Sequence, residues 1–130
     1  MIEEINNRID EIDDTIQDLR DERYELEKKL MVEQQEKLKC LVGLCVVRGS
    51  EVFKVIDVPQ EDKMSVGFSF NPYQIPVVRL GKTTITKMTL FSRAVDAEDP
   101  KEQFLKEHQT CSKGHFEKRL MNIVERLNNI

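Results

Sequence analysis

The first thirty residues carry a regular pattern in which apolar positions recur at alternating intervals of three and four. The apolar residues are Ile2, Ile5, Ile9, Ile12, Ile16, Leu19, Leu26 and Leu30. This spacing fills the a and d positions of about four heptads, which is the sequence requirement for a coiled coil. A helix from Ile2 to Leu30 would be roughly 40 Å long, more than a small domain can cover. We therefore predict a coiled-coil oligomerisation helix over residues 1–35.

Arg23 occupies an a position within this apolar run. We call the eight apolar positions together with Arg23 the seam. A cation at a costs stability while it fixes register, whereas isoleucine at both a and d favours three or four parallel helices. In a parallel pair, Arg8 would attract Asp13 and Glu22 would repel Glu27, so charge leaves the orientation open. We predict a homo-oligomer of two to four chains; a helix folded back onto its own domain is the alternative.

Beyond Leu38 the pattern changes from helical to extended. We predict five short strands, over residues 41–47, 52–58, 64–70, 74–80 and 84–92. Gly49-Ser50 and Gly81-Lys82 are hairpin turns, and Pro76 predicts that the fourth strand is an edge strand or starts late. Residues 38–93 therefore form a β-module, a small antiparallel β-meander or half-barrel, and the fold class is α+β.

The C-terminal segment, residues 99–130, predicts one or two helices. Asp99, Pro100 and Glu102 form a strong helix start with a capping box. A last amphipathic helix carries an apolar stripe of Phe116, Leu120, Ile123, Val124 and Leu127. We expect this stripe to cover the open side of the sheet or to pack against the coiled coil.

Charge is distributed unevenly along the 130 residues, whose net charge is −4. Residues 1–37 hold 13 acidic and 6 basic side chains, whereas residues 38–93 hold 4 acidic and 8 basic ones. The segments thus carry −7 and +4, and residues 94–130 carry −1. Such asymmetry is typical of an anion-facing module on an acidic helix, although acidic coiled coils and mildly basic β-domains are also ordinary.

Basic and aromatic side chains are interspersed along the β-module. The candidate ligand-binding residues are Arg48, Lys54, Tyr73, Arg79, Lys82, Lys87 and Arg93. Cations bind phosphate and aromatic faces stack on bases, so the pattern favours a nucleotide-like anion or single-stranded nucleic acid. Phe68 and Phe70 alternate with small residues, which favours the core over a binding site. Tyr73 follows a turn and is expected to be at least partly exposed.

The cysteines and histidines do not predict a metal centre. Cys111 and His115 would share a helix face with His108 one turn away, but Cys40 and Cys45 surround an apolar strand. We expect no metal and no cofactor.

Other sequence features bear on compartment and catalysis. Three cysteines without framework spacing favour a reducing, cytoplasmic compartment. The chain contains no secretory signal and no run of about 18 apolar residues that would span a membrane. It also contains no Gly-rich phosphate loop, nucleophile elbow or His-Glu-x-x-His motif. We therefore expect a protein that is not an enzyme.

The segment LVGLCVVRGSEVFKVIDV follows the charged helix and opens the β-region. In this order of parts, residues 30–92 resemble small accessory proteins of tailed phages. The resemblance implies a non-catalytic inhibitor that acts in the host cytoplasm on a host or defence protein, including anti-defence proteins that mask an effector or sequester its nucleotide signal. It assigns no binding residues.

Three hypotheses for the function follow. The first is an oligomeric binding protein that presents β-modules to a partner. The second is a nucleic-acid-binding protein that uses the basic β-surface. The third is a structural or assembly protein that acts through the coiled coil alone.

Overall fold

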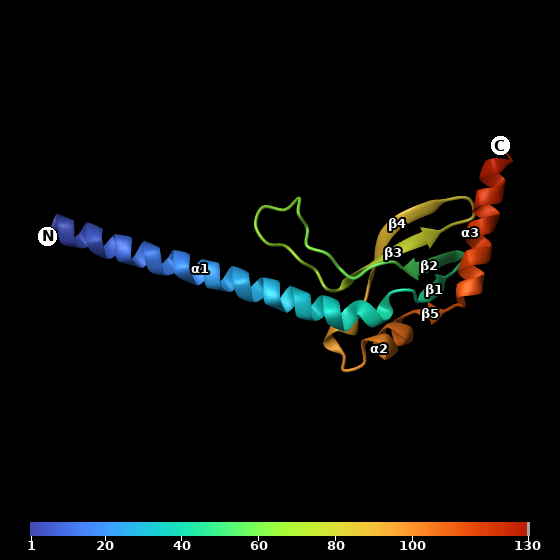
Figure 1. Cartoon of the computed structure of the whole chain (residues 1–130), viewed down its shortest axis with the longest axis horizontal. Helices are drawn as coiled ribbons and strands as arrows, with labels where there is room; N and C mark the ends of the chain where they lie inside the picture. The colour runs from blue at the N-terminus through green and yellow to red at the C-terminus, as the bar shows by residue number, and fades with distance from the viewer. Residues whose placement is uncertain (130) are drawn as a thin grey trace.

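A long N-terminal helix, α1 (Ile2–Leu38), extends well beyond a small α+β domain in the computed structural model, which describes residues 1–129 (Figure 1). The other elements are η1 (Lys39–Leu41), β1 (Cys45–Arg48), β2 (Glu51–Val55), β3 (Gln74–Leu80), β4 (Ile85–Phe91), η2 (Ala94–Asp96), α2 (Pro100–Glu107), β5 (Gln109–Thr110) and α3 (Lys113–Asn128). At 1.5 Å per residue, α1 is about 55 Å long. The predicted α+β class and long N-terminal helix are confirmed. Residue 130 of the predicted C-terminal segment lies outside the described residues.

The strands form one antiparallel sheet in the order β4-β3-β2-β1-β5. The first four strands follow one another as a meander, and β5 pairs with β1. The sheet is open, because β4 and β5 form its two edges. The predicted five-stranded antiparallel sheet is confirmed, but its fifth strand is the two-residue β5, which carries no apolar pattern of its own.

The predicted strand over residues 64–70 is wrong, because this segment belongs to a long loop. Strand β2 pairs directly with β3, so the residues between them leave the sheet. The loop runs beside α1 (Figure 1), where the rings of Phe68 and Tyr24 meet edge-on with their centroids 6.1 Å apart. Phe68 and Phe70 are both half-buried. Phe68 therefore packs against the long helix and not within the core of the sheet.

Two further predictions about the strands are corrected. Strand β1 begins at Cys45 and not at residue 41, because Gly43 adopts a φ of +93°, which glycine tolerates and which interrupts the extended run. Strand β3 is internal, so the edge position predicted from Pro76 is wrong. The last β2–β3 pair involves Val77, and beyond it the Pro76 carbonyl accepts a 3.1 Å hydrogen bond from the Ile56 N–H. The proline is tolerated because the β2–β3 ladder ends beside it.

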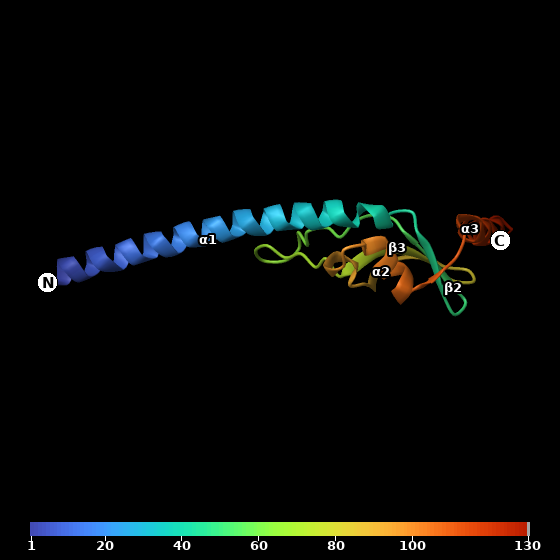
Figure 2. The ribbon, with the colours of Figure 1, turned by 90° about the horizontal axis from the view of Figure 1, so that it is seen from below.

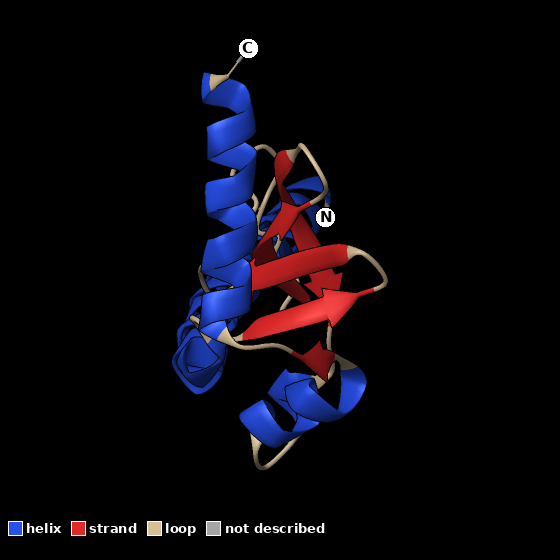
Figure 3. Cartoon of the chain, turned by 90° about the vertical axis from the view of Figure 1, so that its right-hand side faces the viewer, coloured by secondary structure: helices blue, strands red, loops and turns tan. Residues whose placement is uncertain are grey.

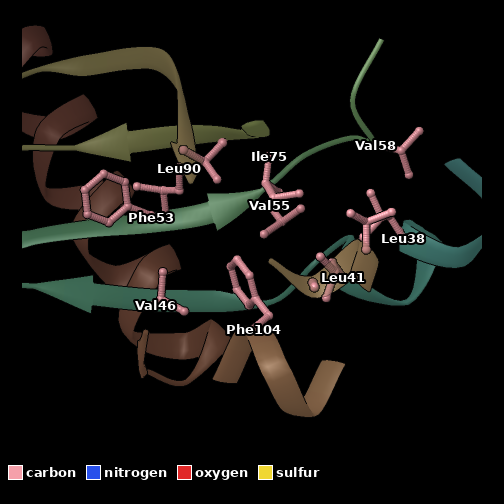
Figure 4. Packing of buried hydrophobic residues seen from close by; sticks show 12 residues of the cluster. Leu38, Leu41, Val46, Phe53, Val55, Val58, Ile75, Leu90 and Phe104 are labelled. Atoms are coloured by element: carbon pink, nitrogen blue, oxygen red, sulfur yellow. The ribbon is translucent and has the colours of Figure 1, made fainter. Parts of the chain in front are cut away.

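The main hydrophobic core lies on one face of the sheet and is closed by η1, η2, α2 and the end of α1 (Figure 4). Its buried residues are Leu38, Leu41, Val46, Phe53, Val55, Val58, Ile75, Val77, Leu90, Ala94, Val95 and Phe104. Leu38 is the one residue of α1 that is fully enclosed. The helix is therefore anchored by its C-terminal turn, and its first half extends away from the domain.

The opposite face of the sheet is covered only in part, by α3 (Figure 3). A second core forms there from Cys45, Val52, Leu80, Phe116 and Ile123. Val124 and Leu127, which belong to the same predicted apolar stripe, remain exposed. Of the two positions expected for this helix, the structure shows the one against the sheet.

Helix α2 starts at the predicted N-cap, where Asp99 Oδ1 accepts a 3.1 Å hydrogen bond from the Glu102 N–H. The Glu102 carboxylate pairs with Lys106 at 3.3 Å instead of returning to the cap, so half of the capping box is formed. At the other end of the helix, the Glu107 carboxylate accepts a 2.9 Å hydrogen bond from the buried Ser92 hydroxyl. This contact joins α2 to the end of β4.

Replacing Phe104 by alanine tests the importance of the main core. Phe104 is fully buried, and such a truncation costs about 3–5 kcal/mol because it removes apolar burial and leaves a cavity. We expect Phe104→Ala to lower the free energy of unfolding by that amount in urea titrations. The matched control is Phe91→Ala, since Phe91 is 53% exposed and should cost about 1 kcal/mol through its ring contact with Tyr73. Equal losses in the two variants would contradict the described core.

Candidate association surface and ligand groove

The apolar side chains of the seam are exposed along the whole of α1. Their exposed fractions range from 41% for Ile16 to 78% for Ile2. A row of eight large aliphatic side chains on one helix exceeds the scattered exposure that is normal for a soluble surface. The domain to which the helix belongs therefore leaves the seam uncovered.

One contact between α1 and its own domain comes from an a position beyond the seam, where Lys37 Nζ donates a 2.7 Å hydrogen bond to the Val95 carbonyl. Most of the others lie on a different stripe of the helix. This stripe consists of Tyr24, Lys28, Met31, Gln35 and Leu38, again at alternating intervals of four and three. Tyr24 meets Phe68, and Gln35 Nε2 donates a 2.9 Å hydrogen bond to the Pro59 carbonyl. These residues occupy the b and f positions of the heptad. Each residue turns the helix by about 100°, so the middle of the b/f stripe lies about 150° around the helix from the middle of the a/d stripe.

This arrangement directs the seam away from the domain. In Figure 2 the loop and α2 lie along one side of the C-terminal half of α1. A second helix packed against the seam between Ile2 and Leu30 would therefore leave the contacts of this stripe in place.

Arg23 has an ion partner within its own helix. Its Nε lies 2.9 Å from Glu27 Oε1, one turn further along α1. Both side chains line a shallow hollow of about 410 Å³ together with Leu19, Glu22, Leu26 and Leu30. The a-position cation thus carries a carboxylate beside it, which lowers the cost of placing it in a helical interface.

The seven predicted ligand-binding residues do not form one patch. Arg48 and Arg79 lie on the face of the main core. There the Arg48 guanidinium is 5.4 Å from the Phe53 ring centre, and Arg79 lies 3.6 Å from the Glu51 carboxylate. Arg79 is thus paired with a carboxylate within the fold, whereas Arg48 is exposed at the end of β1.

Tyr73 and Arg93 lie at another end of the sheet. The half-buried Tyr73 ring stacks on Phe91 with their centroids 6.1 Å apart, and its hydroxyl donates a 3.2 Å hydrogen bond to Asp96. That hydrogen bond raises the pKa of the Tyr73 hydroxyl, and Arg93 lies close enough to oppose the effect. The expectation that Tyr73 is partly exposed is confirmed.

Lys54, Lys82 and Lys87 lie nearer to α3. The register places Lys54 and Lys87 on either side of Val78, on the face that α3 covers in part. Lys82, in the turn between β3 and β4, lines a polar hollow with Arg119 and Arg126 of α3. Of these cations, Arg119 is held by the fold, because its Nη1 donates to the Ser50 carbonyl at 2.9 Å.

A groove of about 610 Å³ lies between α3 and the sheet on this face. Its apolar lining comes from Val42, Ile56, Val78, Ile85, Phe116 and Leu120, and its cations are Lys54 and Lys113. Lys113 and Phe116 were not among the predicted site residues, because only the packing of α3 on the sheet brings them to Lys54. Two signals of this face were present in the sequence: Lys54 alternates with the apolar residues of its strand, and the apolar stripe of the last helix contains Phe116 and Leu120.

The cysteines and histidines lie in several places. Cys40 is exposed after α1, whereas Cys45 and Cys111 lie next to each other, with the Cys111 N–H donating to the Cys45 carbonyl at 3.0 Å. His108 Nε2 lies 3.2 Å from the Phe91 carbonyl, and His115 is exposed at the start of α3. Within residues 1–129, no three His, Cys, Asp or Glu side chains are grouped in a way that would hold a metal ion.

Comparison of the chain with protein families, curated proteins and solved structures gives no match. No helix in the described part of the chain combines the length and the apolar character that crossing a membrane requires.

The three thiols should differ in reactivity. Burial raises the pKa of the Cys45 and Cys111 thiols, whereas Cys40 is exposed. With iodoacetamide at pH 8, we expect Cys40 to be alkylated at least about tenfold faster than the other two, because the thiolate is the reactive form. Peptide mass spectrometry over time measures the rates, and the protein unfolded in urea is the control. Equal rates in the folded protein would show that Cys45 and Cys111 are not enclosed as described.

Proposed function

We propose that this chain is an oligomeric, non-catalytic binding protein in which the seam of α1 joins two copies and the β-modules contact a partner. One observation carries the proposal: the exposed seam faces away from the domain to which it is attached. Helices associate through rows of aliphatic a and d positions of this kind. The domain is not needed to cover the seam and remains free to bind a partner.

We infer that the two helices pair antiparallel. In a parallel pair, Arg23 would face the partner's Arg23 in a single layer, and two like charges in one layer repel. In an antiparallel pair that aligns Ile5 with the partner's Leu30, Arg23 faces the partner's Ile12 instead. Each arginine then keeps its contact with Glu27 without meeting a second cation.

Net charge supports the same orientation. Residues 1–20 hold 7 acidic and 2 basic side chains, and residues 21–38 hold 6 acidic and 4 basic ones, so the two halves carry −5 and −2. An antiparallel pair separates the two more acidic halves, which a parallel pair would place side by side. The flanking positions favour neither orientation, because Asp13 would attract the partner's Arg20 while Arg8 would repel the partner's Lys29.

The partner of the β-modules belongs to the same proposal. The resemblance of residues 30–92 to phage accessory proteins supports a host or defence protein, or its nucleotide signal, as the target. Two modules on one rod would bind a multivalent target more tightly than either module alone, because the second contact is intramolecular. The function proposed is thus inhibition by binding, with the helix setting the number of modules.

Disrupting the seam should dissociate the assembly. We expect Ile9→Asp with Ile16→Asp to convert the oligomer to monomers, because each carboxylate would be desolvated within an apolar layer. Sedimentation equilibrium measures the mass. The control, Asn7→Asp with Gln17→Asp, adds the same charge on other faces of the helix and should leave the mass unchanged. A wild-type chain that sediments as a monomer at all concentrations would overturn the proposal.

Cysteine cross-linking tests the orientation. In a Cys40→Ser background, we expect a mixture of Ile5→Cys and Leu30→Cys chains to form a disulfide-linked dimer on mild oxidation, because these positions face each other only in the antiparallel pair. Neither variant alone should cross-link. Non-reducing electrophoresis gives the result, with the off-seam Asn7→Cys as the control. A covalent dimer of Ile5→Cys alone would show that the helices are parallel.

A further inference from the structure

The groove beside α3 combines an apolar floor with cations at its rim. Its lining includes Val78 from the sheet and Phe116 and Leu120 from α3. Its volume of about 610 Å³ falls within the range of about 300–1,000 Å³ that small-molecule sites occupy. A volume of this size suits a small organic molecule.

The sheet register brings two lysines to this face. Lys54 and Lys87 each pair with Val78, from β2 on one side and from β4 on the other. Strands lie about 4.8 Å apart, so the two lysine Cα atoms are about 10 Å apart with Val78 between them. Lys113 adds a third cation from the first turn of α3, beside Gly43, where a Cβ would lie 3.9 Å from its Nζ.

The charge of these lysines is not compensated by close carboxylates. Among the described residues, none of the ion pairs involves Lys54, Lys87 or Lys113. Lys54 Nζ lies 5.5 Å from the centre of the Phe116 ring, at the apolar wall of the groove. Glu117, one turn beyond Lys113 on α3, lies close enough to act on the same Cys45 thiol as Lys54 and Lys113, with the opposite sign.

We propose that this groove binds a small organic anion with an apolar body, of the medium-chain carboxylate class. The anionic group lies between Lys54 and Lys113, and the aliphatic body covers Val78 between Ile56 and Leu120. Contact with two ammonium groups provides charge-assisted hydrogen bonds, and the apolar walls remove the body from water. The site does not use the seam, so it goes beyond the proposed oligomeric function.

Binding of octanoate, octanol and acetate measures separately what the anionic group and the apolar body of the ligand contribute. We expect octanoate to bind at one site per chain in isothermal titration calorimetry. Octanol, which lacks the charge, and acetate, which lacks the body, should each bind at least about tenfold more weakly, a difference of about 1.4 kcal/mol. Absence of saturable octanoate binding below about 1 mM overturns the proposal.

Matched variants locate the bound molecule. Lys54→Gln with Lys113→Gln should weaken octanoate binding at least about tenfold, whereas Lys101→Gln with Lys118→Gln, which alters lysines outside the groove, should not change it. Urea titration of each variant shows whether it remains folded. If both double variants bound octanoate with equal affinity, the proposal that it binds at Lys54 and Lys113 would be overturned.

Two further measurements separate this site from other sources of binding. The Ile9→Asp, Ile16→Asp protein should bind octanoate as the wild type does, whatever its mass, so failure of the oligomer and failure of the groove are distinguishable. Loss of binding in that protein would place octanoate on the seam and overturn the proposal. Adenosine monophosphate should bind more weakly than octanoate. If it bound more tightly, and the Lys54→Gln, Lys113→Gln variant lost that binding, the proposed ligand class would be overturned in favour of a nucleotide.

Discussion

The burial of Leu38 in the core of the sheet is the contact on which the rest of this architecture depends. It fixes the rotation of α1 about its own axis, because Tyr24, Lys28, Met31 and Gln35 must then face the same domain. A helix rotated by one residue, about 100°, would turn a different stripe toward the loop. The packing of one leucine thus decides that the aliphatic seam is presented to solvent, where a second helix has access to it.

The two faces of the sheet are covered unequally, and this difference creates the candidate ligand groove. The end of α1, η2 and α2 close one face around Phe53 and Phe104, both of which are fully buried. On the other face α3 contributes Phe116 and Ile123 and leaves Ile56 and Ile85 substantially exposed. The step between α3 and the uncovered sheet holds Lys54 in a partly apolar setting. A few charged groups set among apolar walls are typical of small-molecule sites, which is the basis of the ligand class proposed for this groove.

Several parts of the fold were predictable because they depend on local patterns. The 3-4 spacing of isoleucines and leucines predicted α1, and Asp99 predicted the start of α2 through its side-chain cap. Alternation predicted strands near the observed positions of β2, β3 and β4. The segment 64–70 has the same alternation but is a loop: Met64 and Val66 are exposed, and Phe68 packs against Tyr24 of α1. Alternation within one segment does not determine whether another strand pairs with it.

The long helix, the apolar seam along it, the two hairpins β1–β2 and β3–β4 and the amphipathic character of α3 can be read from the order of the residues alone. These features follow from periodicity and turn chemistry within stretches of a few residues to a few turns. Four features depend instead on how the elements pack in three dimensions: the direction in which the seam faces, the addition of β5 to the sheet, the dispersal of the predicted cationic residues, and the meeting of Lys113 with Lys54 at one groove. Those outcomes depend on contacts between residues far apart in the chain, such as Lys54 with Phe116, and no local pattern encodes them.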